Sequence, residues 1–194
     1  GSDSDYQIRI YDAGPDEEFD LSDFFTINNN PGTNTDNEIS INNSFDYIDN
    51  YNSKEYYISN FPSTWESANE ISQSLGANLV CINSATENEF LLNKLINLPN
   101  YDSNNFDVWI GLYQDFYDPS FSEPNGGWKW VSGEPLNYTN WRTWTGEPND
   151  NEDGEDYGKM YVNTNNDAGT WNDDVTSSQV LFVIELSTEE ESEP

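Results

Sequence analysis

Residues 147–156 read Glu-Pro-Asn-Asp-Asn-Glu-Asp-Gly-Glu-Asp, and residues 171–174 read Trp-Asn-Asp-Asp. Both segments are rich in carboxylate and amide oxygens, the hard donors with which Ca²⁺ fills about six to eight coordination positions. An acidic loop taken alone is more often a solvated surface than an ion site. The Asp-x-Asp-x-Asp-Gly register of a helix–loop–helix calcium site is absent. The sequence therefore predicts a calcium site whose ligands come from two separated segments.

The surrounding sequence predicts two helices, several short strands and one long loop. Ser63-Thr64-Trp65-Glu66 has the capping-box pattern, and apolar residues then recur at helical spacing until Gly76. Ser84-Ala85-Thr86-Glu87 is a second capping box, which predicts a helix through about Leu98. A polar loop runs from about Trp141 to Asp156, and an ordered loop of that length in a compact domain is usually functional. Strands are expected over residues 6–11, 54–61, 78–83, 108–113, 127–131, 157–162 and 179–186.

Several motifs follow the two predicted helices in a fixed order. They are Trp109-Ile110-Gly111-Leu112, Trp128-Lys129-Trp130, Glu147-Pro148-Asn149, Gly154-Glu155-Asp156 and Trp171-Asn172-Asp173. Each motif alone is weak, but their order resembles that of the C-type lectin family over about residues 54–186. The resemblance implies an α+β, C-type lectin-like fold, with two helices packed on antiparallel sheets and a long calcium-binding loop. We expect that domain over residues 51–187, an N-terminal extension over 1–50 that could add a strand, and an acidic tail or linker over 188–194.

The resemblance also implies a set of ligands. Carried over motif by motif, the calcium ligands are Glu147, Asn149, Glu155, Asn172 and Asp173, and the first four of these also hydrogen-bond to sugar hydroxyls. In the family the proline of Glu-Pro-Asn is cis, so we expect a cis peptide bond before Pro148. Glu-Pro-Asn accompanies mannose, fucose and glucose-type ligands in the family, whereas Gln-Pro-Asp accompanies galactose. An auxiliary calcium site is implied at Asp150, Asp156 and Asp115, with Asp118 and Glu123 as further candidates.

The chain departs from the family at its cysteines. Ser72 and Tyr157 stand where family members usually carry disulfide cysteines, and Cys81, the one cysteine of the chain, lies in an apolar run and is predicted to be buried. Crosslinks worth about 2–4 kcal/mol each are therefore missing, and the core and bound calcium must compensate. This departure points away from an animal secreted lectin and toward a bacterial or viral surface protein.

Composition excludes several other functions. The 37 acidic and 6 basic residues give a net charge of −31, which repels nucleic acids and anionic membrane surfaces. The chain contains no histidine, so imidazole-based catalysis and histidine zinc sites are excluded. No apolar run approaches the roughly 20 residues that span a bilayer, so no membrane insertion is expected. The acidity favours a salt-exposed bacterial adhesin. We interpret Gly1-Ser2 as a remnant of expression, so the compartment is inferred only indirectly.

These features predict a binding module and not an enzyme. It would recognise cell-surface glycans through calcium, as part of a larger surface protein in an extracellular or cell-surface location. Two alternatives remain: calcium could brace the loop for recognition of a protein, a peptide or ice, or the domain could be a spacer in a large adhesin. Glu152 and Glu155 could imitate the carboxylate pair of a glycosidase, but calcium ligation explains their neighbourhood.

Overall fold

The computed structural model describes residues 44–99, 101, 106–151 and 154–188, together with the backbone of β1 (Arg9–Tyr11) and β2 (Glu18–Asp20). The chain divides into two compact units, residues 1–45 and 46–194. In the first unit β1 pairs with β2 in an antiparallel ladder, and β1 coincides with the end of the strand predicted over residues 6–11. Most of the predicted extension, and the predicted tail beyond residue 188, lie outside the described residues.

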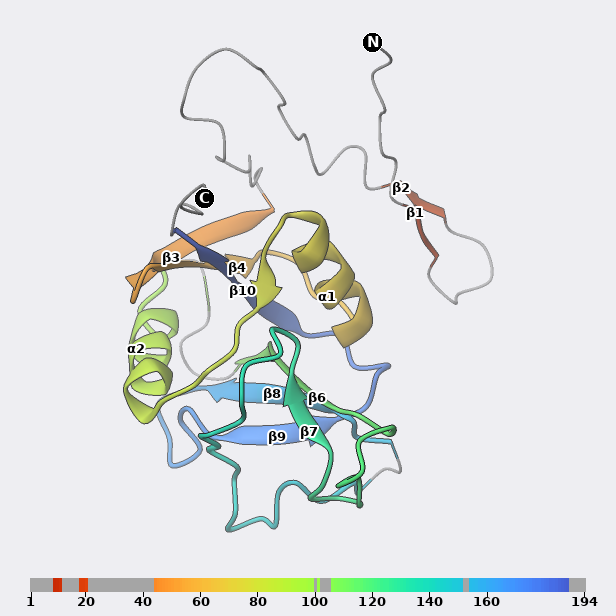
Figure 1. The fold of residues 1–194 in the computed structure, drawn as a ribbon. Helices are drawn as coiled ribbons and strands as arrows, with labels where there is room; N and C mark the ends of the chain where they lie inside the picture. Colours follow the sequence, from red (N-terminus) through yellow and green to blue (C-terminus); the bar gives the residue numbers. More distant parts are fainter. Residues whose placement is uncertain are drawn as a thin grey trace, which may run out of the picture. The chain divides into compact units, whose positions relative to one another are not determined.

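The second unit is built on one large sheet with the strand order β3-β4-β10-β6-β8-β9, to which β5 and β7 add on β10 and β6 (Figure 1). Most neighbours run antiparallel, but β10 and β6 are parallel, with Leu181 opposite Val108. The sheet is therefore mixed: the α+β fold is confirmed, and the parallel pair is a departure from the antiparallel sheets that were predicted. The long chain between the two strands supplies the crossover that a parallel pair requires. The strands are β3 (Phe45–Tyr51), β4 (Lys54–Ser59), β5 (Asn78–Leu79), β6 (Phe106–Gln114), β7 (Trp128–Trp130), β8 (Tyr157–Val162), β9 (Trp171–Asp174) and β10 (Leu181–Ser187).

Both predicted helices are present, with small shifts at their ends. Helix α1 (Trp65–Ser74) is capped by Thr64, whose hydroxyl accepts a hydrogen bond from the backbone N–H of Ser67. It therefore begins one residue later than a cap at Ser63 would place it. Helix α2 (Ala85–Leu95) is capped by Ser84 as predicted, but it ends before Leu98. Neither helix is long and apolar enough to cross a membrane, and the same holds for all helical segments in the described part of the chain.

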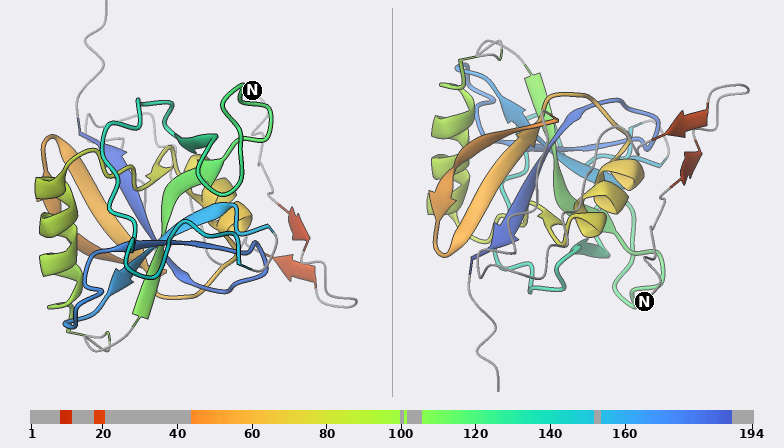
Figure 2. Two further views of the ribbon diagram at one scale, coloured as in Figure 1. Left: turned by 90° about the horizontal axis from the view of Figure 1, so that it is seen from below. Right: turned by 90° about the horizontal axis from the view of Figure 1, so that it is seen from above.

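The helices cover different parts of the sheet. In Figure 2, α2 lies beside β3 and β4, and α1 lies on the other side of these strands. Phe90 of α2 stacks on Tyr51 of β3 with ring centroids 4.8 Å apart, and it also contacts the ring of Tyr56 in β4. The indole N–H of Trp65, at the start of α1, donates to the carbonyl of Ile110 in β6. Both helices are thus tied to strands by aromatic side chains.

Strand β6 carries the centre of the core. Val108, Trp109, Ile110 and Leu112 are all fully buried, as expected for a central strand that is covered on both faces. Between them, Gly111 allows a close approach of neighbouring segments. A Cβ atom there would lie 2.6 Å from the carbonyl oxygen of Leu79, so no larger residue fits without moving the backbone.

Hydrogen bonds and packing take the place of crosslinks at the two positions where cysteines are usual in the family. Ser72 is buried, and its hydroxyl donates to the carbonyl of Ala68. The hydroxyl of Tyr157 donates to Oε1 of Glu66 at 2.8 Å, and the same oxygen accepts a hydrogen bond from Thr176. The Tyr157 ring also stacks on Trp65 at 4.5 Å. Glu66 therefore joins α1, β8 and the segment after β9 without a covalent bond.

Candidate functional site

The long loop is fastened to strand β9 where it begins. The guanidinium of Arg142 donates two hydrogen bonds to the carboxylate of Asp167, at 2.9 and 3.1 Å. The backbone N–H of Arg142 donates to the carbonyl of Trp171, and the N–H of Trp171 donates to the carbonyl of Asn140. A planar, bidentate pair of this kind fixes geometry as well as charge. The loop therefore starts from a rigid base before it reaches the predicted ligands.

Glu147 and Asn149 lie together at the turn that follows. The peptide bond before Pro148 is cis, as predicted. The side chain of Glu147 is only 8% exposed, and its Oε1 accepts a hydrogen bond from the hydroxyl of Thr145 at 3.0 Å. Its Oε2 accepts a hydrogen bond from the side-chain amide of Asn149. The motif thus presents a nearly buried carboxylate and an exposed amide side by side.

Asp173 lies beneath this turn, in strand β9, and is fully buried. Its Oδ2 accepts hydrogen bonds from the backbone N–H groups of Asn149 and Asp150, at 2.8 and 2.9 Å. Its other oxygen, Oδ1, has no hydrogen-bond partner. A buried acceptor without a partner is costly, so the structure leaves one carboxylate oxygen available to a ligand.

The second half of the loop brings Glu155 to the same place. Glu155 is 8% exposed, and its Oε2 accepts a hydrogen bond from the N–H of Asn151 at 2.7 Å. Asp150 holds the loop in shape because its Oδ1 accepts from the N–H groups of Gly154 and Glu155. Both Asp150 and Gly154 have positive φ angles, 46° and 100°. These left-handed positions fold the chain back tightly enough for Glu155 to approach the turn at Glu147.

Glu147, Glu155 and Asp173, hereafter the loop carboxylates, repel one another. Burial raises the pKa of each of them, and coulombic repulsion within the group adds to this: Asp173 raises the pKa of both Glu147 and Glu155. Among the ion pairs of the described residues, none joins a lysine or arginine to a loop carboxylate. Buried charge of one sign requires a counter-charge or protonation. A divalent cation would meet this requirement, and the oxygen donors suit Ca²⁺.

Asn172 is the one predicted ligand whose side chain has no described contact with a carboxylate group of Glu147, Glu155 or Asp173. It precedes Asp173 in β9, lies opposite Lys159 of β8, and is only partly buried. Its side-chain amide donates to the backbone carbonyl of Asp173. Four of the five predicted ligands are therefore linked through hydrogen bonds or shared electrostatics, and Asn172 stands beside them.

The predicted auxiliary ligands separate into two groups. Burial raises the pKa of Asp156 to about 6, and nearby Glu123 and Asp150 add to the effect; its Oδ1 is buried without a partner. Asp115 and Asp118 instead both pair with Lys129, at 2.8 Å each, which lowers the pKa of both carboxyls. Asp150 and Glu123 thus lie close enough to Asp156 to raise its pKa, whereas Asp115 forms an ion pair with Lys129.

Gln114 is a polar neighbour of this second group that the sequence reasoning missed. Its backbone N–H donates to the carbonyl of Asp156 at 2.9 Å. Its side-chain oxygen Oε1 is buried without a partner, while its Nε2 donates to the carbonyl of Gly126. A glutamine at the end of the apolar run over residues 108–113 was the signal that could have identified it.

Most tryptophans near the site belong to the core. Trp128, Trp130 and Trp171 are buried, whereas Trp144 is 58% exposed in the turn before Glu147. Lys159 does not reach the loop carboxylates in a described contact, because it pairs with Asp107 and Asp174. The suggested glycosidase partner of Glu155, residue 152, lies outside the described residues.

Comparisons with known proteins identify the family of the chain. The family model described as Lectin C-type domain matches residues 61–184. CD209 antigen of Symphalangus syndactylus is 33% identical over 133 residues, which is 68% of this chain and 30% of that protein. C-type lectin domain family 4 member M of Nomascus concolor is 38% identical over 99 residues, 50% of this chain and 22% of that protein. The chain thus matches less than a third of the length of either relative.

A solved structure of another protein is also similar to this chain. The carbohydrate-recognition domain of the mouse scavenger receptor C-type lectin is 27% identical, with a TM-score of 0.57, over 76% of this chain and 97% of that domain. The family match covers the two helices, the long loop, strands β5 to β9 and the first residues of β10. On the strength of that match, which extends over more than half of its length, the chain belongs to the C-type lectin domain family.

Proposed function

We propose that this domain binds carbohydrate through Ca²⁺, with Glu147, Asn149, Glu155, Asn172 and Asp173 as the ligands of the ion. The observation that carries the proposal is the group of loop carboxylates, which are nearly or fully buried, have raised pKa values and include an oxygen without a partner. Bound calcium would supply the missing positive charge and an open coordination position for neighbouring sugar hydroxyls.

The side chains at the rim of the site suit recognition of a hydroxyl pair. Glu147 offers only acceptors and Asn149 offers N–H donors, so the two in this order distinguish hydroxyls by their donor and acceptor roles. We infer a preference for mannose, fucose or glucose-type sugars with suitable vicinal hydroxyls. Since such sites are shallow and wet, single-sugar affinity is expected to be weak and to depend on multivalency.

The wider setting is also part of the proposal. We place the domain in a larger surface protein, outside the cell or at its surface, where it binds glycans on other cells as an adhesin module and not as an enzyme. The absence of cysteine pairs and the net charge of −31 support a microbial source in a salty environment. The relatives named above are animal proteins by their source, so this assignment rests on composition alone.

A glycan array with calcium and with chelator tests the function. Binding of mannose or fucose-type glycans in calcium, and its loss in chelator, is the expected result. The double change Glu147→Gln and Asn149→Asp should move the preference toward galactose-type sugars, and Glu70→Gln on the exposed face of α1 is the control. If no glycan binds, recognition of a protein, a peptide or ice replaces this proposal, and if binding persists in chelator, calcium has no part in sugar recognition.

A further inference from the structure

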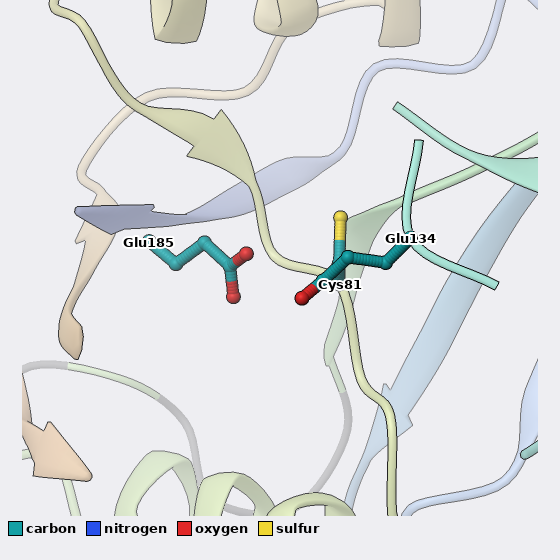
Figure 3. A group of neighbouring side chains, drawn as sticks. All are labelled: Cys81, Glu134 and Glu185. Carbon is teal, nitrogen blue, oxygen red and sulfur yellow. The ribbon is translucent and has the colours of Figure 1, made fainter. Parts of the chain in front are cut away.

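A second group of donor side chains lies outside the loop, around Cys81. A ligand atom from each of Cys81, Glu134 and Glu185 lies within 4.8 Å of the other two. Figure 3 shows Glu185 reaching from its strand toward Cys81 and Glu134. None of the three belongs to residues 147–156 or to β9. The group is therefore distinct from the loop carboxylates.

Three separate segments bring these side chains together. Glu185 of β10 lies opposite Asn78 of β5, and Cys81 lies two residues after the end of β5. Glu134 comes from the turn after β7, where its Oε2 accepts a hydrogen bond from the amide of Asn83 at 2.7 Å. Glu134 and Glu185 border a cavity of about 230 Å³, which is also lined by Lys54, Asn78, Ser132 and Ser187, and Cys81 is buried beside them.

The carboxylate of Glu185, beside the cavity, has a partner for only one of its two oxygens. Glu185 is 4% exposed; its Oε1 pairs with Lys54 at 2.9 Å, but its Oε2 is buried without a hydrogen-bond partner. Lys54 also lies 3.8 Å from Oε2 of Glu134. One ammonium against two carboxylates leaves one negative charge at the pocket. Burial raises the pKa of Glu185 to about 7, and the nearby carboxylate of Glu87 adds to this effect.

We propose that Cys81, Glu134 and Glu185 form a second metal site, for a thiophilic divalent cation of the Zn²⁺ class. A thiol beside two carboxylates suits such an ion, because Zn²⁺ accepts both sulfur and oxygen ligands, whereas Ca²⁺ takes oxygen. Bonds of about 2.0–2.3 Å require the three donors to contract slightly. The side chain of Glu134 is 44% exposed, and its described hydrogen bonds from Asn83 and Ser132 both meet Oε2, so its Oε1 can turn inward.

Binding requires two local changes. The Cys81 thiol gives up its proton to solvent as the metal–sulfur bond forms, since a coordinating thiol is deprotonated by the ion. Lys54 stays protonated, breaks its ion pair with Glu185 and turns away from it within the pocket that Lys54 already lines. Water completes the tetrahedral shell. Affinity should therefore rise with pH, because a proton is released.

Cadmium provides a direct test because Cys81 is the one thiol of the chain. The reduced full chain, in excess calcium so that the loop is occupied, is titrated with Cd²⁺ while the ultraviolet cadmium–thiolate charge-transfer band is recorded. We expect a band that saturates at one cadmium per chain and is suppressed by Zn²⁺. Cys81→Ser should abolish it, with circular dichroism confirming that the variant folds.

The carboxylate variants separate a built site from a lone thiol. Glu134→Gln changes a partly exposed residue and should weaken cadmium binding by at least about tenfold. Loss of a group that only supports the ligands of a metal already lowers affinity by about that factor. Glu70→Gln, an exposed glutamate on α1, should leave it unchanged. The absence of a band in excess cadmium, or equal affinity in these two variants and the unmodified chain, would overturn the proposal. Neither result depends on glycan binding.

Discussion

Replacing Asp173 by asparagine should remove calcium binding while keeping the fold. Both backbone donors to this side chain, the N–H groups of Asn149 and Asp150, meet the same oxygen, Oδ2. An asparagine carbonyl in that position retains both hydrogen bonds, and its NH₂ group replaces the unpartnered Oδ1. The change therefore deletes one buried negative charge and one candidate calcium ligand, and little else.

The expected magnitude follows from linkage. At a calcium concentration about 100 times Kd, calcium stabilises the unmodified chain by about 2.7 kcal/mol. For a chain of this size that raises Tm by about 5–11 °C. If Asp173→Asn weakens calcium about 100-fold, the same concentration only equals the new Kd. The gain then falls to about 0.4 kcal/mol, or about 1–2 °C. Without calcium the variant should be at least as stable as the unmodified chain, because burial raises the pKa of Asp173 and so disfavours its charge.

Thermal unfolding in calcium and in chelator measures both quantities. Asp174→Asn is the matched control, since Asp174 is the next residue of β9 but pairs with Lys159 at 2.6 Å. That variant should lose stability in both conditions and keep the full calcium shift. An undiminished shift in Asp173→Asn would refute the assignment of Asp173 as a ligand, and a collapse of the calcium-free variant would refute the claim that its charge is unfavourable.

Three further predictions concern stability. In chelator, lowering the pH from 7 to about 5 should raise Tm. Asp156, with a folded pKa of about 6, and the loop carboxylates have higher pKa values in the folded than in the unfolded chain, so their ionised forms destabilise the fold. A steady fall in Tm over this range would contradict the burial argument. Tyr157→Phe removes a hydrogen bond to the Glu66 carboxylate and should cost about 1–3 kcal/mol in urea unfolding, whereas no change would mean that the contact adds nothing. Gly158→Ala would place a Cβ atom 2.8 Å from that of Leu112, so we expect about 1–3 kcal/mol of destabilisation by the same assay; an unaffected midpoint would mean that β8 shifts freely.

Local patterns in the sequence predicted the helices and most strands because each depended on neighbours in the chain. The cap at Ser84 and the buried β6 are of this kind, and the cap of α1 was predicted to within one residue. The parallel pairing of β6 with β10 was not predicted, because period-two alternation reveals a strand but not the direction of its partner. The pairing of Asp115 with Lys129 also escaped prediction, since their contact depends on how β6 and β7 align.

In the candidate site too, local sequence predicted some features, while others depend on how the strand lies in the fold. The motif assigned Asn172 and Asp173 to one calcium shell, yet consecutive side chains of a strand point to opposite faces. In β9, Trp171 and Asp173 are buried while Asn172 and Asp174 are partly exposed. Asp173 can therefore approach an ion from beneath the loop, held by two backbone amides, but Asn172 must reach it from the open side. The residue anchored in the sheet is fixed by the fold, and the one at the surface retains freedom to adjust to what binds there.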